Sequence, residues 1–148
     1  MRAEKAFWDA SALVPLCVQE ASSQFVERQA RQRGPVVWWG TGVEVCSAIH
    51  RLYRIGKITE KQRQGALGRL NLIKKGWGEI LPSDAVRSLS EELLAEHPLK
   101  AADSLQLGAA LAWCDGRPAG RNFVCGDERL SEAARAEGFA VVELPKST

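Results

Sequence analysis

The chain has 148 residues, of which 45% are hydrophobic and 26% charged, a composition typical of soluble globular proteins that excludes disordered, fibrous and membrane classes. Its length predicts a single domain over residues 1–148, large enough to bury a core without disulfides or a structural metal. The net charge of +2 is too small to indicate a nucleic-acid partner by itself.

The four cysteines are scattered among apolar residues without any CxxC spacing, at positions 17, 46, 114 and 125. We therefore expect buried free thiols rather than disulfides or zinc ligands, which favours a reducing cytoplasm. Asp9 interrupts the apolar run near the N-terminus, and no apolar stretch approaches the ~18 residues of a membrane span. The sequence predicts a soluble, cytoplasmic protein without a membrane segment.

The first quarter of the chain predicts the order strand, helix, helix, strand. Residues 5–8 (KAFW) form a buried strand that ends at Asp9, and residues 11–18 form a short helix that Pro15 permits only near its first turn. A second helix follows over 21–33, and the β-branched and aromatic run 36–39 (VVWW) predicts the next strand.

Two helices that form a hairpin are expected next. The first follows Gly40 and Thr41 and is stopped by Gly56. The second begins at Thr59, where Gln62 completes a capping box, and runs to about Lys75. This segment holds eight basic residues against one acid, Glu60, which indicates a solvated helix face or, less commonly, a phosphate-binding surface: Arg51, Arg54, Lys57, Lys61, Arg63, Arg69, Lys74 and Lys75.

The second half predicts a weak strand at 79–82, a helix at 83–97, a helix at 98–114 with Pro98 in its first turn, a strand at 122–125, a helix at 127–138 and a strand at 139–144. The helix at 98–114 is apolar nearly all round and belongs in the interior. Continuous apolar strands that alternate with helices indicate a parallel sheet covered on both faces. The predicted fold class is a three-layer α/β/α domain with a helical hairpin.

Four carboxylates stand out against this fold. In a parallel sheet the strand-to-helix turns share one edge, so Asp9, Asp127 and Glu44 should converge there. Asp103 interrupts an apolar face of the most buried helix, where an unpaired acid is costly.

Each acid also has a simpler interpretation. Asp9 and Asp127 are suitable helix caps, Glu44 suits the start of a helix, and Asp103 could pair with an arginine. As a group, however, they would repel, because two unit charges ~4 Å apart cost about 4 kcal/mol at an effective dielectric of ~20. Raised pKa values would relieve this repulsion, and a hard divalent cation, Mg²⁺ or Mn²⁺, is the more economical answer.

Four segments in order, FWDASALVPL, TGVEVCSAI, LKAADSLQLGAAL and FVCGDERLSEAARAEGFAVV, resemble the motifs of PIN domains, and among these the VapC-type toxin ribonucleases. The resemblance covers residues 6 to about 144. Its metal-binding quartet corresponds to Asp9, Glu44, Asp103 and Asp127, and the hydroxyl of its first motif to Ser11. Cys125 stands where a threonine is usual, and Gln106 where a histidine is frequent.

The resemblance implies a homodimer, a cognate antitoxin whose basic residues enter the acidic pocket, and RNA as the substrate. The expected mechanism is hydrolysis of a phosphodiester by water that one or two Mg²⁺ ions activate and orient in line, leaving a 5′-phosphate and a 3′-hydroxyl. Ser11 would hydrogen-bond a ligand carboxylate or a water molecule.

Two other functions fit the same residues. A non-catalytic module could bind RNA or a protein through the acidic pocket, and a phosphatase or phospho-acceptor could use Asp9 as its nucleophile, although Ser11 stands where that class usually has a second acid.

His50 and His97 form a poor catalytic pair because no nucleophile motif accompanies them. Among the tryptophans, Trp77, between two glycines, is the one expected to stack on a base, and the other four are expected in the core.

Overall fold

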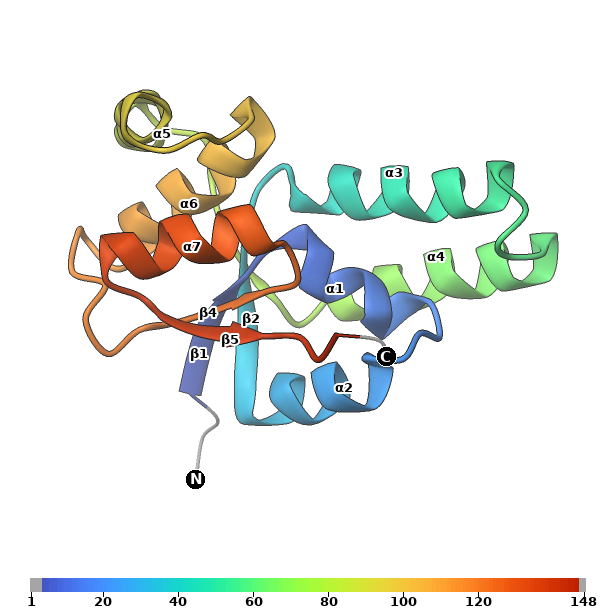
Figure 1. Cartoon of the computed structure of the whole chain (residues 1–148). Helices are drawn as coiled ribbons and strands as arrows, with labels where there is room; N and C mark the ends of the chain where they lie inside the picture. Colours follow the sequence, from blue (N-terminus) through green and yellow to red (C-terminus); the bar gives the residue numbers. More distant parts are fainter. Residues whose placement is uncertain (1–3, 147–148) are drawn as a thin grey trace.

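The computed structural model describes residues 4–146, which form a five-stranded parallel sheet in the order β3-β2-β1-β4-β5 between two layers of helices (Figure 1). The strands are β1 (Glu4–Trp8), β2 (Arg33–Trp38), β3 (Gly78–Ile80), β4 (Asn122–Cys125) and β5 (Ala140–Glu143). The helices are α1 (Ala10–Cys17), α2 (Ser23–Gln32), α3 (Thr41–Arg54), α4 (Glu60–Lys74), α5 (Asp84–Glu96), α6 (Ala101–Trp113) and α7 (Glu128–Glu137). The predicted three-layer α/β class is confirmed.

The central strand β1 divides the core between the two layers. Because successive strand side chains point to opposite faces, Ala6 and Trp8 pack with helices α1 to α4, whereas Phe7 packs with α5 to α7. The ring of Phe7 stacks on that of Phe123 in β4, with 5.6 Å between ring centroids. This double burial explains why the last three residues of β1 before Asp9 are apolar, whereas Glu4 and Lys5 at its start are exposed.

The predicted hairpin is formed by α3 and α4, which lie side by side and extend away from the sheet at the right of Figure 1. Thr59 and Gln62 form the predicted capping box at the start of α4. Of the eight basic residues in this region, all except Arg63 are exposed, and Arg63 lies over the Tyr53 ring. The hairpin therefore presents a solvated, positively charged surface.

Two expectations about prolines were wrong. Asp9 caps α1, so the helix begins at Ala10 and Pro15 lies beyond its first turn, where it removes the bond to the Ser11 carbonyl. Pro98 lies outside α6, which begins at Ala101 because Lys100 before it is extended. His97 takes the extended conformation that a following proline favours, and this ends α5. Residues 97–100 instead form a short connection between α5 and α6.

Two further expectations concern the cysteines and membrane-spanning helices. The four cysteines are free thiols, as predicted, and three of them are buried. In the part of the chain that the structure describes, no helix is both long and apolar enough to cross a membrane.

Candidate functional site

The four predicted carboxylates come from four elements at the edge of the sheet where its strands end. Asp9 follows β1, Glu44 lies in the first turn of α3 after β2, Asp127 follows β4, and Asp103 lies in the first turn of α6. Their charges act on one another. The charge of Asp103 contributes to raising the pKa values of Asp9 and Glu44, and that of Asp127 to raising the pKa of Asp103.

Asp9 is the most deeply buried of the four, with 4% of its surface exposed. Its Oδ2 accepts hydrogen bonds from the Ser11 backbone N–H (3.2 Å), the Ser11 hydroxyl and Cys125 Sγ (3.6 Å). Burial raises the pKa of Asp9 to about 6, the bonds from Ser11 and Cys125 oppose this rise, and the charge of Asp103 adds to it. Asp9 is thus a desolvated acid held rigidly at the end of β1.

Ser11 and Cys125 connect Asp9 to the end of β4. The Ser11 hydroxyl donates to Asp9 and accepts from the backbone N–H of Gly126 at 2.8 Å. Cys125 Sγ accepts from the Asp127 N–H at 3.3 Å, and burial keeps its pKa far above the ordinary thiol value. The thiol therefore stays protonated and makes the contacts with Asp9 and Asp127 from the position where the resembled family carries a hydroxyl.

Glu44 is oriented by a polar group buried inside α6. The Gln106 side-chain amide is fully buried and donates to Glu44 Oε2 at 2.6 Å and to Thr41 Oγ1 at 3.0 Å. Burial raises the pKa of Glu44 to about 7, the bond from Gln106 opposes this, and the charges of Asp9 and Asp103 add to it. This role of Thr41 and Gln106 was not predicted from the sequence, although Gln106 stands out there as a polar residue in an otherwise apolar helix, three positions after Asp103.

The helix-cap interpretation holds for two of the acids. Asp9 caps α1, and Asp127 caps α7 through a 2.9 Å bond from the Leu130 N–H to Oδ1. Among residues 4–146, the side-chain bonds to Asp9 all go to Oδ2 and that to Asp127 goes to Oδ1. Each carboxylate therefore keeps a second oxygen for another ligand, so a cap and a site are compatible.

Asp103 lies elsewhere than expected. Because α6 begins at Ala101, Asp103 is half-buried at the entrance of the helix rather than on a buried apolar face. Burial raises its pKa and the charge of Lys100 lowers it. Within residues 4–146, no lysine, arginine or histidine forms an ion pair with any of the four acids, so the arginine partner considered for Asp103 is not found.

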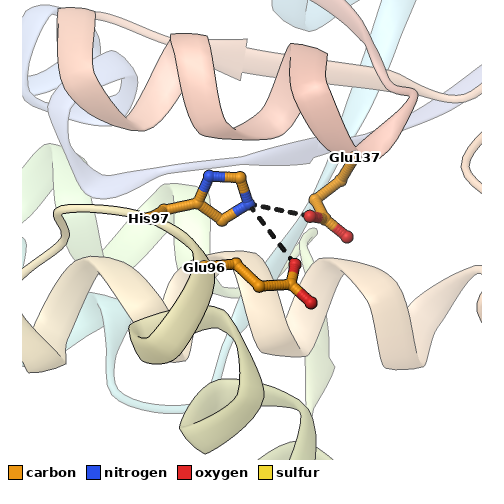
Figure 2. A group of neighbouring side chains, drawn as sticks. All are labelled: Glu96, His97 and Glu137. Carbon is orange, nitrogen blue, oxygen red and sulfur yellow. Dashed lines mark hydrogen bonds and ion pairs between the residues drawn. The ribbon is translucent and has the colours of Figure 1, made fainter.

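The donor set of the quartet suits a hard cation. Four carboxylates without a basic partner offer only oxygen ligands, which Mg²⁺ and Mn²⁺ prefer. The four carboxylates do not, however, form a tight cluster. Within residues 4–146, the only three His, Cys, Asp or Glu side chains with ligand atoms all within 4.8 Å of one another are Glu96, His97 and Glu137 (Figure 2). The wider quartet suits an ion that keeps several of its water molecules.

The expectations for two tryptophans were wrong. Trp77 is only 9% exposed, because it packs in the core beneath α4 and its indole N–H donates to Glu79 at 3.0 Å. Trp39, which follows β2 and precedes Glu44 by five residues, is 56% exposed. Trp39 lies in the turn between β2 and α3, beyond the end of the strand, so it is the tryptophan available for a partner.

The raised pKa values predict how stability depends on pH when metal is chelated. The native state keeps protons on Asp9 and Glu44 at pH values where the unfolded chain has lost them, so stability falls as the pH rises from about 4 to about 7. We expect Asp9→Asn to equal the wild type near pH 4 and to exceed it at pH 7 by up to about 3 kcal/mol. Urea unfolding in EDTA at a series of pH values measures this difference. The same dependence of the free energy of unfolding on pH in the two proteins would contradict the prediction.

Similarity to known proteins is found in three-dimensional structure. No protein-family model matches the sequence, and no curated protein does. A chain in the crystal structure of VapBC2 from Rickettsia felis, which is bound to a DNA fragment from the VapBC2 promoter, has 12% identity and a TM-score of 0.66. The match covers 95% of this chain and 98% of that chain. PAE2754 from Pyrobaculum aerophilum has 17% identity and a TM-score of 0.65, with 95% and 89% covered. A toxin–antitoxin complex from Klebsiella pneumoniae contains a chain with 16% identity and a TM-score of 0.57, with 86% and 91% covered.

Proposed function

We propose that this chain, which has the three-layer fold of VapC-type PIN domains, is a metal-dependent endoribonuclease and the toxin of a toxin–antitoxin pair. The observation that carries the proposal is the group of four acids at the carboxyl edge of the sheet, desolvated in part and without a basic partner in residues 4–146. The structural neighbours, two of which are described as VapBC2 and as a toxin–antitoxin complex, support the toxin role.

In this mechanism Asp9, Glu44, Asp103 and Asp127 would hold Mg²⁺ or Mn²⁺, directly or through water. When bound, the ion activates a water molecule and offsets charge on the leaving oxygen. Asp9 is held by Ser11 and Cys125, which fixes its direction at the end of β1. Positioned ligands of this kind reduce the reorganisation needed during the reaction.

Other surfaces would recruit the phosphate backbone and the bases. The exposed basic residues of the α3–α4 hairpin are suitable for phosphate contacts, and Lys100 lies near enough to Asp103 to lower its pKa. The exposed ring of Trp39, close in sequence to Glu44, is suitable for stacking on an RNA base.

Three further properties belong to the proposal. The partner would be an antitoxin whose basic side chains enter the acidic pocket, where they would supply the missing positive charge. Two copies would associate through the hairpin, on which Ile55 and Leu72 are exposed. The chain would work as one domain in the cytoplasm, in agreement with its free thiols.

The proposal is tested by incubating the purified protein with RNA in Mg²⁺ and in EDTA. We expect cleavage in Mg²⁺ that EDTA abolishes and that added Mg²⁺ or Mn²⁺ restores, with 5′-phosphate and 3′-hydroxyl ends. Cleavage that persists in EDTA would contradict the metal mechanism. RNA binding without cleavage under any metal would favour the non-catalytic module.

Gln106 should act as a positioning residue for Glu44. Gln106→Leu removes the 2.6 Å bond that lowers the pKa of Glu44, so we expect RNA cleavage to fall about 10- to 100-fold and its acid limb to shift to higher pH. Gln106→His retains a donor and should recover much of the activity. The test is a pH–rate profile of the three proteins, and an unchanged acid limb in Gln106→Leu would rule out the positioning role.

A further inference from the structure

A second group of ligand-type side chains lies outside the quartet, at the ends of two helices. Glu96 ends α5, His97 follows it directly, and Glu137 ends α7, forty residues later (Figure 2). His97 Nε2 lies 2.8 Å from Glu137 Oε2 and 3.8 Å from Glu96 Oε2. The side chains of His97 and Glu137 are 14% and 23% exposed and that of Glu96 is 60% exposed, so the group is open to solvent on one side.

The charge distribution around this group favours a cation. Glutamates at the last position of a helix add to the negative end of its dipole, and both Glu96 and Glu137 occupy that position. Among residues 4–146, the only ion-pair partner of either glutamate is the imidazole of His97. Two carboxylates face this single imidazole, so the group carries a net negative charge whether or not the ring is protonated.

The distances suit a tetrahedral ion. Bonds of 2.0–2.2 Å to nitrogen and oxygen separate tetrahedral ligand atoms by roughly 3.3–3.6 Å, and the observed separations of 2.8 and 3.8 Å lie on either side of this range. Small side-chain rotations would equalise them. An imidazole among the ligands also distinguishes this group from the all-oxygen quartet, because nitrogen donors select zinc and related metals over Mg²⁺.

We propose that Glu96, His97 and Glu137 form a second metal site, which binds Zn²⁺ or a similar first-row transition ion with water at the open position. The ion would join the end of α5 to the end of α7, two helices that both pack on α6. The site would also hold the connection 97–100, which leads into the first turn of α6 and Asp103. Binding therefore stabilises the folded protein.

The test is the shift in melting temperature caused by Zn²⁺, measured in excess Mg²⁺ so that the quartet is occupied. At free zinc about 100 times Kd we expect an increase of about 5–10 °C for the wild type. His97→Gln and Glu137→Gln should lose this increase. His50→Gln is the matched control, since the chain has only these two histidines, and it should keep the increase.

Glu96→Gln provides a variant whose folding is secure, because this exposed side chain leaves the His97–Glu137 contact intact. We expect the zinc concentration that gives half of the increase in melting temperature to rise at least about tenfold in this variant. Absorption of the Co²⁺ form offers a second readout, which His97→Gln should abolish. An equal zinc shift in the wild type and His97→Gln would overturn the proposal, and so would the absence of any shift in the wild type.

Discussion

Replacing Asp9 or Asp103 by asparagine is expected to lower RNA cleavage at least about 100-fold while leaving the protein folded. Asparagine has nearly the same shape and can still accept the hydrogen bonds from Ser11, but it removes the negative charge that would hold a divalent cation. The measurement is the initial rate of cleavage of a defined RNA at saturating Mg²⁺, together with circular dichroism of each variant.

Asp84→Asn is the matched control for this charge change. Asp84 also lies in the first turn of a helix, but its side chain is 97% exposed, and its ion pair with Arg87 lies on the surface. We expect its activity and stability to stay close to those of the wild type. Full activity of Asp9→Asn or Asp103→Asn, or an equal loss in Asp84→Asn, would contradict a catalytic role for the quartet.

The stability of the same variants separates catalysis from folding. Because burial and neighbouring charge raise the pKa of Asp9, its charge opposes folding at pH 7 when metal is chelated. Asp9→Asn should thus be inactive and yet at least as stable as the wild type in EDTA. A loss of activity caused by misfolding would instead lower its stability.

The largest effect on stability is expected at Gly108, where α6 packs closely against α5. A Cβ at this position would overlap Ser90 Oγ and would lie 3.1 Å from Ser90 N and 3.2 Å from Ser90 Cβ. The Ser104 hydroxyl donates to the Ser90 carbonyl at 2.5 Å, which holds the two helices at this separation. We expect Gly108→Ala to lower the free energy of unfolding by about 1–3 kcal/mol.

Gly68→Ala is the control for the change in helix propensity. Gly68 lies in α4 with nothing within 4 Å of a Cβ, so alanine there should stabilise the protein by about 0.5–1 kcal/mol. In the double variant Ser90→Ala/Gly108→Ala, the hydroxyl that overlaps the new methyl is absent. Part of the stability lost in Gly108→Ala should therefore be recovered. Urea unfolding measures all four proteins. A stabilising Gly108→Ala would show that α5 is not held against α6 at this residue.

Much of the fold could be predicted because its signals are local. The apolar runs at 5–8, 36–39 and 122–125 predicted strands covered on both faces, and the capping box at Thr59 marked the start of α4. The order of these elements then predicted the edge of the sheet at which Asp9, Glu44 and Asp127 emerge. Each step depended on residues within a few positions of one another or on the topology that parallel sheets share.

Other features depend on packing between distant segments. Whether a tryptophan is buried is decided by the neighbouring elements, so Trp77 lies beneath α4 while Trp39 is exposed. Gln106 meets Glu44 across 62 residues. His97 meets Glu137 only because α5 and α7 both pack on α6.

The sequence by itself therefore determined the α/β class, the order of strands and helices and the four candidate acids, since hydrophobic periodicity and turn residues encode these locally. Only the tertiary structure decided which oxygen of Asp9 and of Asp127 remains available, which polar groups orient Glu44, and that His97 contacts Glu137 at the end of another helix. These contacts depend on helix positions and side-chain directions, which follow from close packing of the whole core rather than from any short stretch of chain.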